Sequence, residues 1–133
     1  MNLLLDTHSI LWCVAKTDKL SKRATEAIID TDNEVFVSSV SFWEIAIKYH
    51  LKRLELPNID ILKIPFICKT MGFEFFNLSP IDAIESFRLP HKENHKDPFD
   101  RMLIYLAIKY SYTLVTCDSK AKFYKSDGLK YLW

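Results

Sequence analysis

Acidic residues follow two apolar segments of the chain, at positions where a strand is expected to end. Asp6 comes directly after residues 2–5, and Asp118 comes directly after residues 113–117. Open α/β sheets bind their ligands at the carboxyl ends of parallel strands, so both acids are candidates for one shared site. Asp is also a favourable helix N-cap, and a cap alone would explain either residue. Two such acids at equivalent positions favour a site.

A third acid, Glu44, lies on the apolar side of a helix predicted over residues 41–54. At about 100° per residue, Glu44 projects roughly 60° from Ile47 and roughly 20° from Leu51. A buried ionised carboxylate costs several kcal/mol unless a cation or hydrogen-bond donors compensate for it. The structural alternative is an ion pair with Lys48, four residues further along the helix.

The segment 97–101 (DPFDR) has the composition of a helix start. Asp97 fits the N-cap, Pro98 fits the first helical position and Asp100 fits the third. However, Asp100 shares its side of the helix with the apolar Leu103, so capping explains Asp97 better than Asp100. The two carboxylates project about 60° apart and can therefore face one place.

Carboxylates that converge without a counter-charge repel one another, and some of them then stay protonated at neutral pH. A divalent cation removes this conflict. The sequence shows no His or Cys at metal-ligand spacing, so hard oxygen ligands favour Mg²⁺ or Mn²⁺ over Zn²⁺. Such ions usually act on phosphates, by activating water and stabilising the developing charge.

Alternating strands and helices must position these acids. Short β-branched and aromatic segments predict strands at residues 2–5, 34–38, 74–77, 113–117 and 130–132. Amphipathic segments predict helices at residues 9–15, 22–31, 41–54, 58–71 (kinked or broken at Pro65), 80–87, 98–109 and 119–124. The alternation predicts one α/β domain over residues 1–133, a three-layer α/β/α sandwich with a short central parallel sheet.

The composition excludes several other classes of protein. The chain has 133 residues, of which 49% are hydrophobic and 26% charged, with a formal net charge of +1, as expected for one globular domain. No apolar run approaches the roughly 18 residues of a membrane span, and we expect neither a secretory signal nor a membrane association. Two glycines are too few for a P-loop or a Gly-rich dinucleotide turn.

Three cysteines, Cys13, Cys68 and Cys117, lie among apolar neighbours, and none belongs to a Cys-x-x-Cys pair. We therefore expect all three to be reduced core residues of a cytoplasmic protein.

Four stretches together resemble the PIN-domain ribonucleases, and within them the VapC-type toxins of bacterial and archaeal toxin–antitoxin pairs. They are LLDTHSILW (4–12), SSVSFWEIAIK (38–48), HKDPFDRMLIYLA (95–107) and LVTCD (114–118). The resemblance implies a three-layer α/β fold and an endoribonuclease that cuts RNA with water activated by Mg²⁺ or Mn²⁺. It also implies an RNA substrate and a cognate antitoxin that holds the enzyme inactive.

The resemblance also assigns roles to individual residues. It implies that the catalytic and metal-binding acids are Asp6, Glu44, Asp100 and Asp118, with Asp97 as an accessory acid that joins the metal shell through water. The hydroxyl groups that would orient the acids or bound water are those of Thr7, Ser39 and Thr116.

Several other residues have both a structural and a functional interpretation. Arg101 is expected to form an ion pair, with a phosphate clamp as the alternative. Lys120 is expected to be solvated or to contact the substrate backbone. His91 and His95 are expected to be solvated loop residues, with contact to an RNA phosphate as the sharper alternative.

Apolar residues give two further expectations. Trp12 and Trp43 are expected in the core. Ile59, Leu62 and Ile67 give the predicted 58–71 helix more apolar surface than one side of a small domain needs, which predicts a homodimer or antitoxin surface.

Two other functions compete with the ribonuclease. A non-catalytic PIN-like binding scaffold has no reason to keep acids on an apolar stripe. A phosphatase or phosphoacceptor of the haloacid type needs a second Asp two residues after the first, and His8 stands at that position.

Overall fold

A five-stranded parallel sheet forms the centre of the computed structural model, which describes residues 1–92 and 94–133. The strand order is β3-β2-β1-β4-β5 and every neighbouring pair is parallel. The strands are β1 (Asn2–Leu5), β2 (Glu34–Ser38), β3 (Glu74–Phe76), β4 (Thr113–Val115) and β5 (Lys130–Leu132). The predicted parallel α/β sheet is therefore confirmed.

The central strand β1 is apolar on both of its faces. Leu3 and Leu5 pack into one core, and Leu4 packs into the other. All three side chains are fully buried. A parallel strand covered on both faces has this continuous apolar sequence rather than an alternating one.

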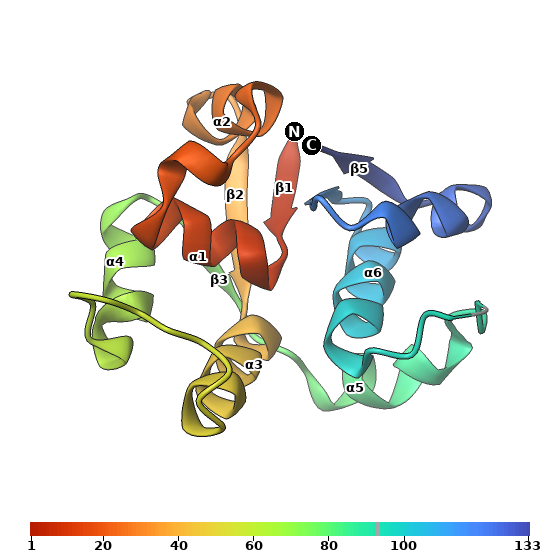
Figure 1. Ribbon diagram of the computed structural model, residues 1–133. Helices are drawn as coiled ribbons and strands as arrows, with labels where there is room; N and C mark the ends of the chain where they lie inside the picture. The colour runs from red at the N-terminus through yellow and green to blue at the C-terminus, as the bar shows by residue number, and fades with distance from the viewer. Residues whose placement is uncertain (93) are drawn as a thin grey trace.

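Helices cover both faces of the sheet, which confirms the three-layer arrangement (Figure 1). One layer holds α1 (Thr7–Ala15), α2 (Lys22–Ile29) and α4 (Ile64–Thr70), together with the short 3₁₀ turns η1 (Thr17–Lys19) and η2 (Ile61–Lys63). The other layer holds α5 (Pro80–Glu85), η3 (Ser86–Arg88), α6 (Pro98–Tyr110) and η4 (Ser119–Asp127).

The helix α3 (Ser39–His50) follows β2 directly and packs against both α1 and α6. Its Val40 belongs to one core and its Ile45 to the other, so the helix bridges the two layers. It begins two residues before the predicted start, because the Ser38 hydroxyl accepts a hydrogen bond from the Val40 amide and caps it. It ends before the predicted residue 54, and Lys52 already has a positive φ of 56°.

The predicted helix over residues 58–71 is shorter in the structure. A 3₁₀ turn precedes α4, and Pro65 lies in the first turn of α4. A proline there lacks only an N–H group that has no partner within the helix, so it starts the helix instead of kinking it. Gly72, with φ of 85°, follows the helix as expected.

Two expectations about burial are wrong. Cys117 is exposed, although Cys13 and Cys68 are buried as expected. The reason is that β4 ends at Val115, so Cys117 has already left the sheet. Trp43 is 64% exposed because it projects away from the buried stripe of α3, and its ring makes an edge contact with Phe99. Among the described residues, no helix is both long enough and apolar enough to cross a membrane.

Candidate metal centre

The first acid, Asp6, lies where β1 passes into α1 and caps that helix. Its Oδ1 accepts a hydrogen bond of 2.7 Å from the Ser9 amide. The residue is only 7% exposed. Burial raises the pKa of the Asp6 carboxyl, while hydrogen bonds from Thr116 and Ser9 act to lower it. Asp6 is therefore a buried acid whose negative charge is only partly compensated.

Asp118 occupies the equivalent position after β4 and caps η4. Its Oδ1 accepts a hydrogen bond of 2.9 Å from the Lys120 amide, and its own amide donates to the Thr116 hydroxyl. Its side chain is 35% exposed. Because β1 and β4 are adjacent parallel strands, Asp6 and Asp118 emerge at the same edge of the sheet.

The start of α6 supplies two more acids in different roles. Asp97 is the N-cap, and its Oδ1 accepts hydrogen bonds of 2.9 Å from the amides of Phe99 and Asp100. Asp100, one turn into the helix, is half-buried. Asp97 caps the helix, so the Asp100 carboxylate is available to the site.

A small pocket of about 10 Å³ lies between these strand ends and α6. Its polar lining comes from Asp6, Asp100, Thr116 and Asp118, and its apolar lining comes from Leu103, Ile104, Leu114 and Ala121. This volume matches one water molecule or one ion rather than an organic ligand.

The charge of the cluster acts on Asp100. Burial, followed by the negative charges of Asp97, Glu44, Asp118 and Asp6, raises the pKa of Asp100 to about 7. Charge contributions of this kind come from carboxylates that lie near Asp100. The fold therefore brings the predicted acids together.

Glu44 reaches the cluster from α3 and has partners of its own. It is 2% exposed. Its Oε1 accepts a hydrogen bond from the Thr7 hydroxyl, and its Oε2 pairs with the Lys48 ammonium. Burial acts to lower the pKa of Lys48, but the Glu44 contact raises it overall, with smaller contributions from Asp97 and Asp100. Both the ion pair and the proximity to the acids are present.

The predicted supporting residues differ in what they touch. Thr7 and Thr116 contact acids of the cluster, as described above. Ser39 does not among the described contacts: its hydroxyl accepts a hydrogen bond of 3.0 Å from the Leu78 amide and ties α3 to the segment after β3. Lys120 contacts Asp118 through its backbone amide.

Arg101 does not form its expected ion pair among the described residues. Its guanidinium donates to the carbonyls of Leu89 and Pro90 and to the Tyr124 hydroxyl, at 3.0–3.1 Å. It therefore fastens the segment before α6 to η4, instead of pairing with a carboxylate.

The sequence analysis missed His95, which the structure brings to the acids. It is 1% exposed, so the expectation of a solvated loop residue is wrong, whereas His91 is exposed. Its Nε2 lies 3.8 Å from Asp118 Oδ2 and 4.0 Å from Asp100 Oδ2. Ligand atoms of these three residues lie within 4.8 Å of one another. A loop has no periodicity that would reveal a buried position, and only its place two residues before Asp97 pointed to His95.

The donor set fits a hard divalent cation. Carboxylate oxygens dominate it, and the raised pKa of Asp100 records negative charge without a matching cation. The pocket between Asp6, Asp100 and Asp118 has the volume of one ion. Mg²⁺ and Mn²⁺ prefer such ligands.

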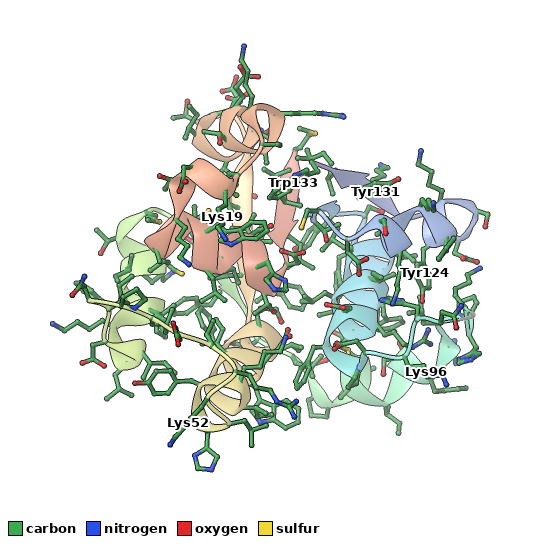
Figure 2. The ribbon with its side chains drawn as sticks, viewed as in Figure 1. Lys19, Lys52, Lys96, Tyr124, Tyr131 and Trp133 are labelled. Atoms are coloured by element: carbon green, nitrogen blue, oxygen red, sulfur yellow. The ribbon has the colours of Figure 1, made fainter. Side chains whose placement is uncertain are left out.

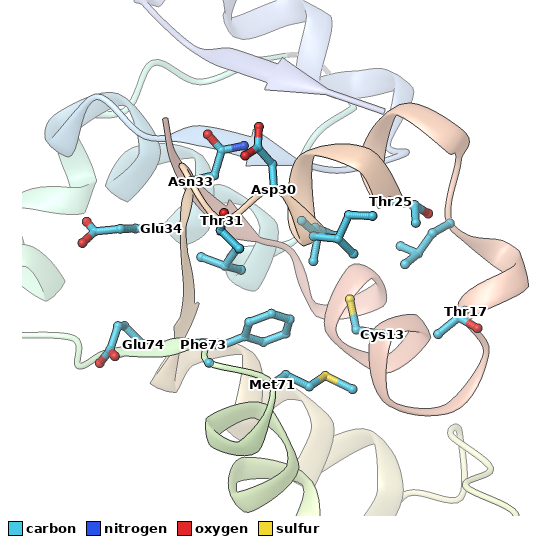
Figure 3. A pocket seen from close by; sticks show the side chains of 15 residues that line it. Cys13, Thr17, Thr25, Asp30, Thr31, Asn33, Glu34, Met71, Phe73 and Glu74 are labelled. Atoms are coloured by element: carbon cyan, nitrogen blue, oxygen red, sulfur yellow. The ribbon is translucent and has the colours of Figure 1, made fainter.

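A second, larger cavity of about 610 Å³ lies at the opposite end of the strands (Figure 3). Its walls come from α1, α2, the start of β2 and the turn between α4 and β3, with Cys13, Phe73 and Met71 among the labelled side chains. Glu34 and Glu74, which line its edge, begin β2 and β3. None of the five clustered acids lines this cavity, so it is separate from the metal centre.

The sequence and the fold are similar to those of known proteins. A family model described as "PIN domain" matches residues 3–129. The sequence is 28% identical over 134 residues to Ribonuclease VapC22 of Mycobacterium tuberculosis, and the match covers 98% of each chain.

Two solved structures share the fold at low sequence identity. VapBC2 from Rickettsia felis, bound to a DNA fragment from its promoter, aligns with a TM-score of 0.71 at 17% identity and covers 100% of this chain and 99% of that one. VapBC-1 from nontypeable Haemophilus influenzae aligns with a TM-score of 0.67 at 14% identity and covers 99% and 97%.

Proposed function

The chain belongs to the PIN-domain family, and on this premise we propose that it is a Mg²⁺- or Mn²⁺-dependent endoribonuclease, the toxin of a toxin–antitoxin pair. The relative that matches over nearly its whole length is named a ribonuclease, and the structural neighbours are named as VapBC complexes. These names support the proposal for this chain.

One observation carries the proposal. Asp6 and Asp118, which follow β1 and β4, and Asp100 on α6 line one pocket with the volume of a single ion. Burial, together with the charges of Asp97, Glu44, Asp118 and Asp6, raises the pKa of Asp100 to about 7. A fold that gathers acids at a cost in repulsion needs a cation to offset that cost. Acids that hold a metal ion explain the arrangement, whereas acids that only cap helices do not require it.

The proposed roles follow from the surroundings of each acid. Asp6, Asp100 and Asp118 line the pocket and would hold the ion. Glu44 would complete the acid set and place its negative charge beside Asp100, while Asp97 would join through water. The ion, when bound, would activate water and stabilise charge on the phosphate.

The other side chains would orient this set. Thr7 fixes Oε1 of Glu44, and Thr116 links Asp6 to Asp118. Lys120 is the proposed contact to the substrate backbone, because it directly follows the cluster on η4. Arg101 could reach a phosphate only with N–H groups that its three described contacts leave free.

The test is cleavage of RNA by the purified protein with Mn²⁺ or Mg²⁺. Asp6→Asn and Asp100→Asn keep the size of each side chain and remove its charge, so we expect cleavage to fall by at least about 1,000-fold, or about 4 kcal/mol. The matched control is Asp82→Asn, a buried acid on α5 outside the cluster, which should leave the cleavage rate unchanged.

Full metal-dependent cleavage by either cluster variant would overturn the assignment. Expression of the wild-type chain should arrest growth, and the same two variants should not. A cognate antitoxin should relieve that arrest, and the gene neighbouring this one is the first candidate for encoding it.

The non-catalytic scaffold remains the competing proposal, because the Glu44–Lys48 ion pair satisfies one of the acids without a metal. Calorimetry separates the two. The nuclease is expected to bind Mn²⁺ at neutral pH and to lose this binding in Asp100→Asn, whereas a scaffold has no need to bind it.

Two exposed apolar patches support protein partners. One contains Leu62 and Phe66, which are 84% and 72% exposed, on η2 and α4. The other contains Ile81, Ile84 and Phe87, which are 61–77% exposed, on α5 and η3. We propose that these patches serve an antitoxin and a second copy of the chain in the cytoplasm. Light scattering of Leu62→Ser and of Ile84→Ser, alone and with antitoxin, would assign each patch.

A further inference from the structure

His95 has a buried nitrogen with no hydrogen-bond partner among the described residues. The side chain is 1% exposed, and Nε2 is the unpartnered atom. A buried polar atom without a partner costs free energy and therefore needs an explanation. The atom faces Oδ2 of Asp118 and of Asp100, so the explanation lies at the metal centre.

The other ring nitrogen belongs to a hydrogen-bond chain with Tyr124 and Arg101. Arg101 Nη1 lies 3.1 Å from Tyr124 Oη, and a guanidinium can only donate. Tyr124 Oη accepts from Arg101, and His95 Nδ1, 2.6 Å away, is the acceptor that the described contacts offer to the Tyr124 hydrogen. Nδ1 is then the acceptor, so the hydrogen of the imidazole ring resides on Nε2.

Neighbouring residues hold the Arg101, Tyr124 and His95 side chains of this hydrogen-bond chain in place. Tyr124, labelled beside α6 in Figure 2, is fully buried. Arg101 is fixed by the carbonyls of Leu89 and Pro90, at 3.0 and 3.1 Å. Residues from α6, η4 and the segment before α6 thus set the orientation of the His95 ring together.

We propose that His95 is a positioning residue of the metal centre, which donates the Nε2 hydrogen to the free oxygens of Asp100 and Asp118 and is not itself a metal ligand. This inference rests on the proposed function. Nε2 lies 4.0 and 3.8 Å from the two Oδ2 atoms, and a shift of about 1 Å by either carboxylate reaches hydrogen-bond distance. The donor would hold these oxygens in the orientation that the ion requires.

A metal ligand needs a lone pair, and the hydrogen-bond chain leaves the lone pair on Nδ1, which faces Tyr124. The proximity of His95 to Asp100 and Asp118 therefore does not turn an oxygen site into a mixed nitrogen site. It leaves a site for Mg²⁺ or Mn²⁺, whose ligand carboxylates are oriented by an outer group.

The first test is the ¹⁵N spectrum of the imidazole in the wild-type protein without metal or RNA. We expect a pyridine-type shift for His95 Nδ1 and a pyrrole-type shift for Nε2. The reverse assignment would overturn the proposal. This measurement decides the tautomer even if the protein cleaves no RNA, so it separates this inference from the proposed function.

The second test compares two amides at position 95. His95→Gln places its amide near Nε2 and keeps a donor to the acids, whereas His95→Asn places its amide near Nδ1 and keeps only the contact with Tyr124. We expect His95→Asn to lower kcat for RNA about 10–100-fold and His95→Gln to stay within about threefold of wild type. Thermal unfolding of both variants serves as the control for folding.

Equal activities of the two amide variants would contradict the donor role. A third readout tests ligation directly, by electron spin echo spectra of the protein loaded with Mn²⁺. The proposal expects no coupling from a directly bound imidazole nitrogen, and such a coupling, absent in His95→Gln, would make His95 a ligand.

Discussion

Two acidic regions of this protein differ in how their charge is compensated: one is on α5, and the other is at the ends of the strands. On α5, Asp82 and Glu85 share the Lys109 ammonium at 2.7 and 2.8 Å, and Tyr110 donates to Asp82 at 2.8 Å. Burial alone would raise the pKa of Asp82, but the hydrogen bonds from Lys109 and Tyr110 lower it overall. The hydrogen bond from Lys109 likewise lowers the pKa of Glu85.

At the strand ends the pKa moves in the opposite direction. Burial and the acidic neighbours raise the pKa of Asp100 to about 7, and burial also raises the pKa of Asp6. Both regions contain acids near apolar side chains, so burial alone does not distinguish them. What differs is the balance of charge. Lys109 pairs with both acids of the α5 region, whereas at the strand ends Lys48 pairs with Glu44 and the other carboxylates have no lysine or arginine partner among the described residues. This surplus of negative charge is the reason why we propose the metal site at the strand ends.

The largest expected difference is in catalysis. Asp118→Asn should lower RNA cleavage at least about 100-fold, since it removes one charge from the ion site but keeps an N-cap of similar quality. Glu85→Gln, its counterpart in the α5 region, should leave the rate unchanged. Equal losses in the two variants, measured with the same RNA and Mn²⁺, would remove the distinction between the regions.

The next effect is on stability, and it belongs to the α5 region. Lys109→Met leaves the buried Asp82 without its cation, and we expect the midpoint of thermal unfolding to fall by several degrees while cleavage persists. Lys22→Met is the control, because its ion pair with Glu26 is long, at 3.8 Å, and exposed, and should contribute almost nothing. Similar midpoints for the two variants would mean that Lys109 does not stabilise the α5 region.

Metal should stabilise the folded protein through the acids of the strand-end region and not through those of the α5 region. At a tenfold excess over its dissociation constant, Mg²⁺ or Mn²⁺ should add about 1.4 kcal/mol to the free energy of unfolding. Asp82→Asn should retain this gain, Asp100→Asn should lose it, and EDTA should reverse it. Denaturant titrations with and without metal measure the difference, and a gain retained by Asp100→Asn would place the ion elsewhere.

The smallest effect concerns pH in the absence of metal. The folded pKa of Asp100, about 7, exceeds its ordinary value of 3.8, so the folded state holds this proton longer than the unfolded chain does. Stability from this group is therefore lost as pH rises from 3.8 to about 7. Asp100→Asn should exceed wild type in stability above this window, by about 1 kcal/mol after screening at a half-exposed group.

Asp82 supplies the opposite case. Its folded pKa is lowered, so its stabilisation is present above its ordinary pKa and is lost as the pH falls through the folded value. Unfolding free energies of wild type, Asp100→Asn and Asp82→Asn between pH 3 and pH 8 should thus diverge in opposite directions. A common pH dependence for the two variants would contradict the assigned pKa directions.

The parts of the fold that were predictable from the sequence are those with a strong local pattern. The strands at Asn2–Leu5, Glu34–Ser38 and Lys130–Leu132 agree with the structure residue by residue, because short β-branched or apolar runs have sharp polar limits. The end of α3 at His50 and the start of α4 at Ile64 differ from the prediction, because capping and the placement of Pro65 override periodicity.

At the candidate site, sequence reasoning selected the acids by their place after predicted strands or on the apolar side of predicted helices. It could not find His95, because neither its burial nor its partner Tyr124, 29 positions away, leaves a local pattern. It likewise could not see that Ser39 bonds Leu78, which is a contact between distant segments. Acids at strand ends can be recognised from the sequence, whereas the side chains that orient them are brought there by the tertiary structure.

The capping hydrogen bonds of Asp6, Asp97 and Asp118 mean that the negative charge of each residue can be removed while its helix cap is kept. Each uses Oδ1 to hold a helix start, and the side-chain oxygen of asparagine can accept the same bond. A single nucleotide change converts an aspartate codon to an asparagine codon. Mutation can therefore yield folded copies of this chain in which the proposed metal centre has lost one of its charges.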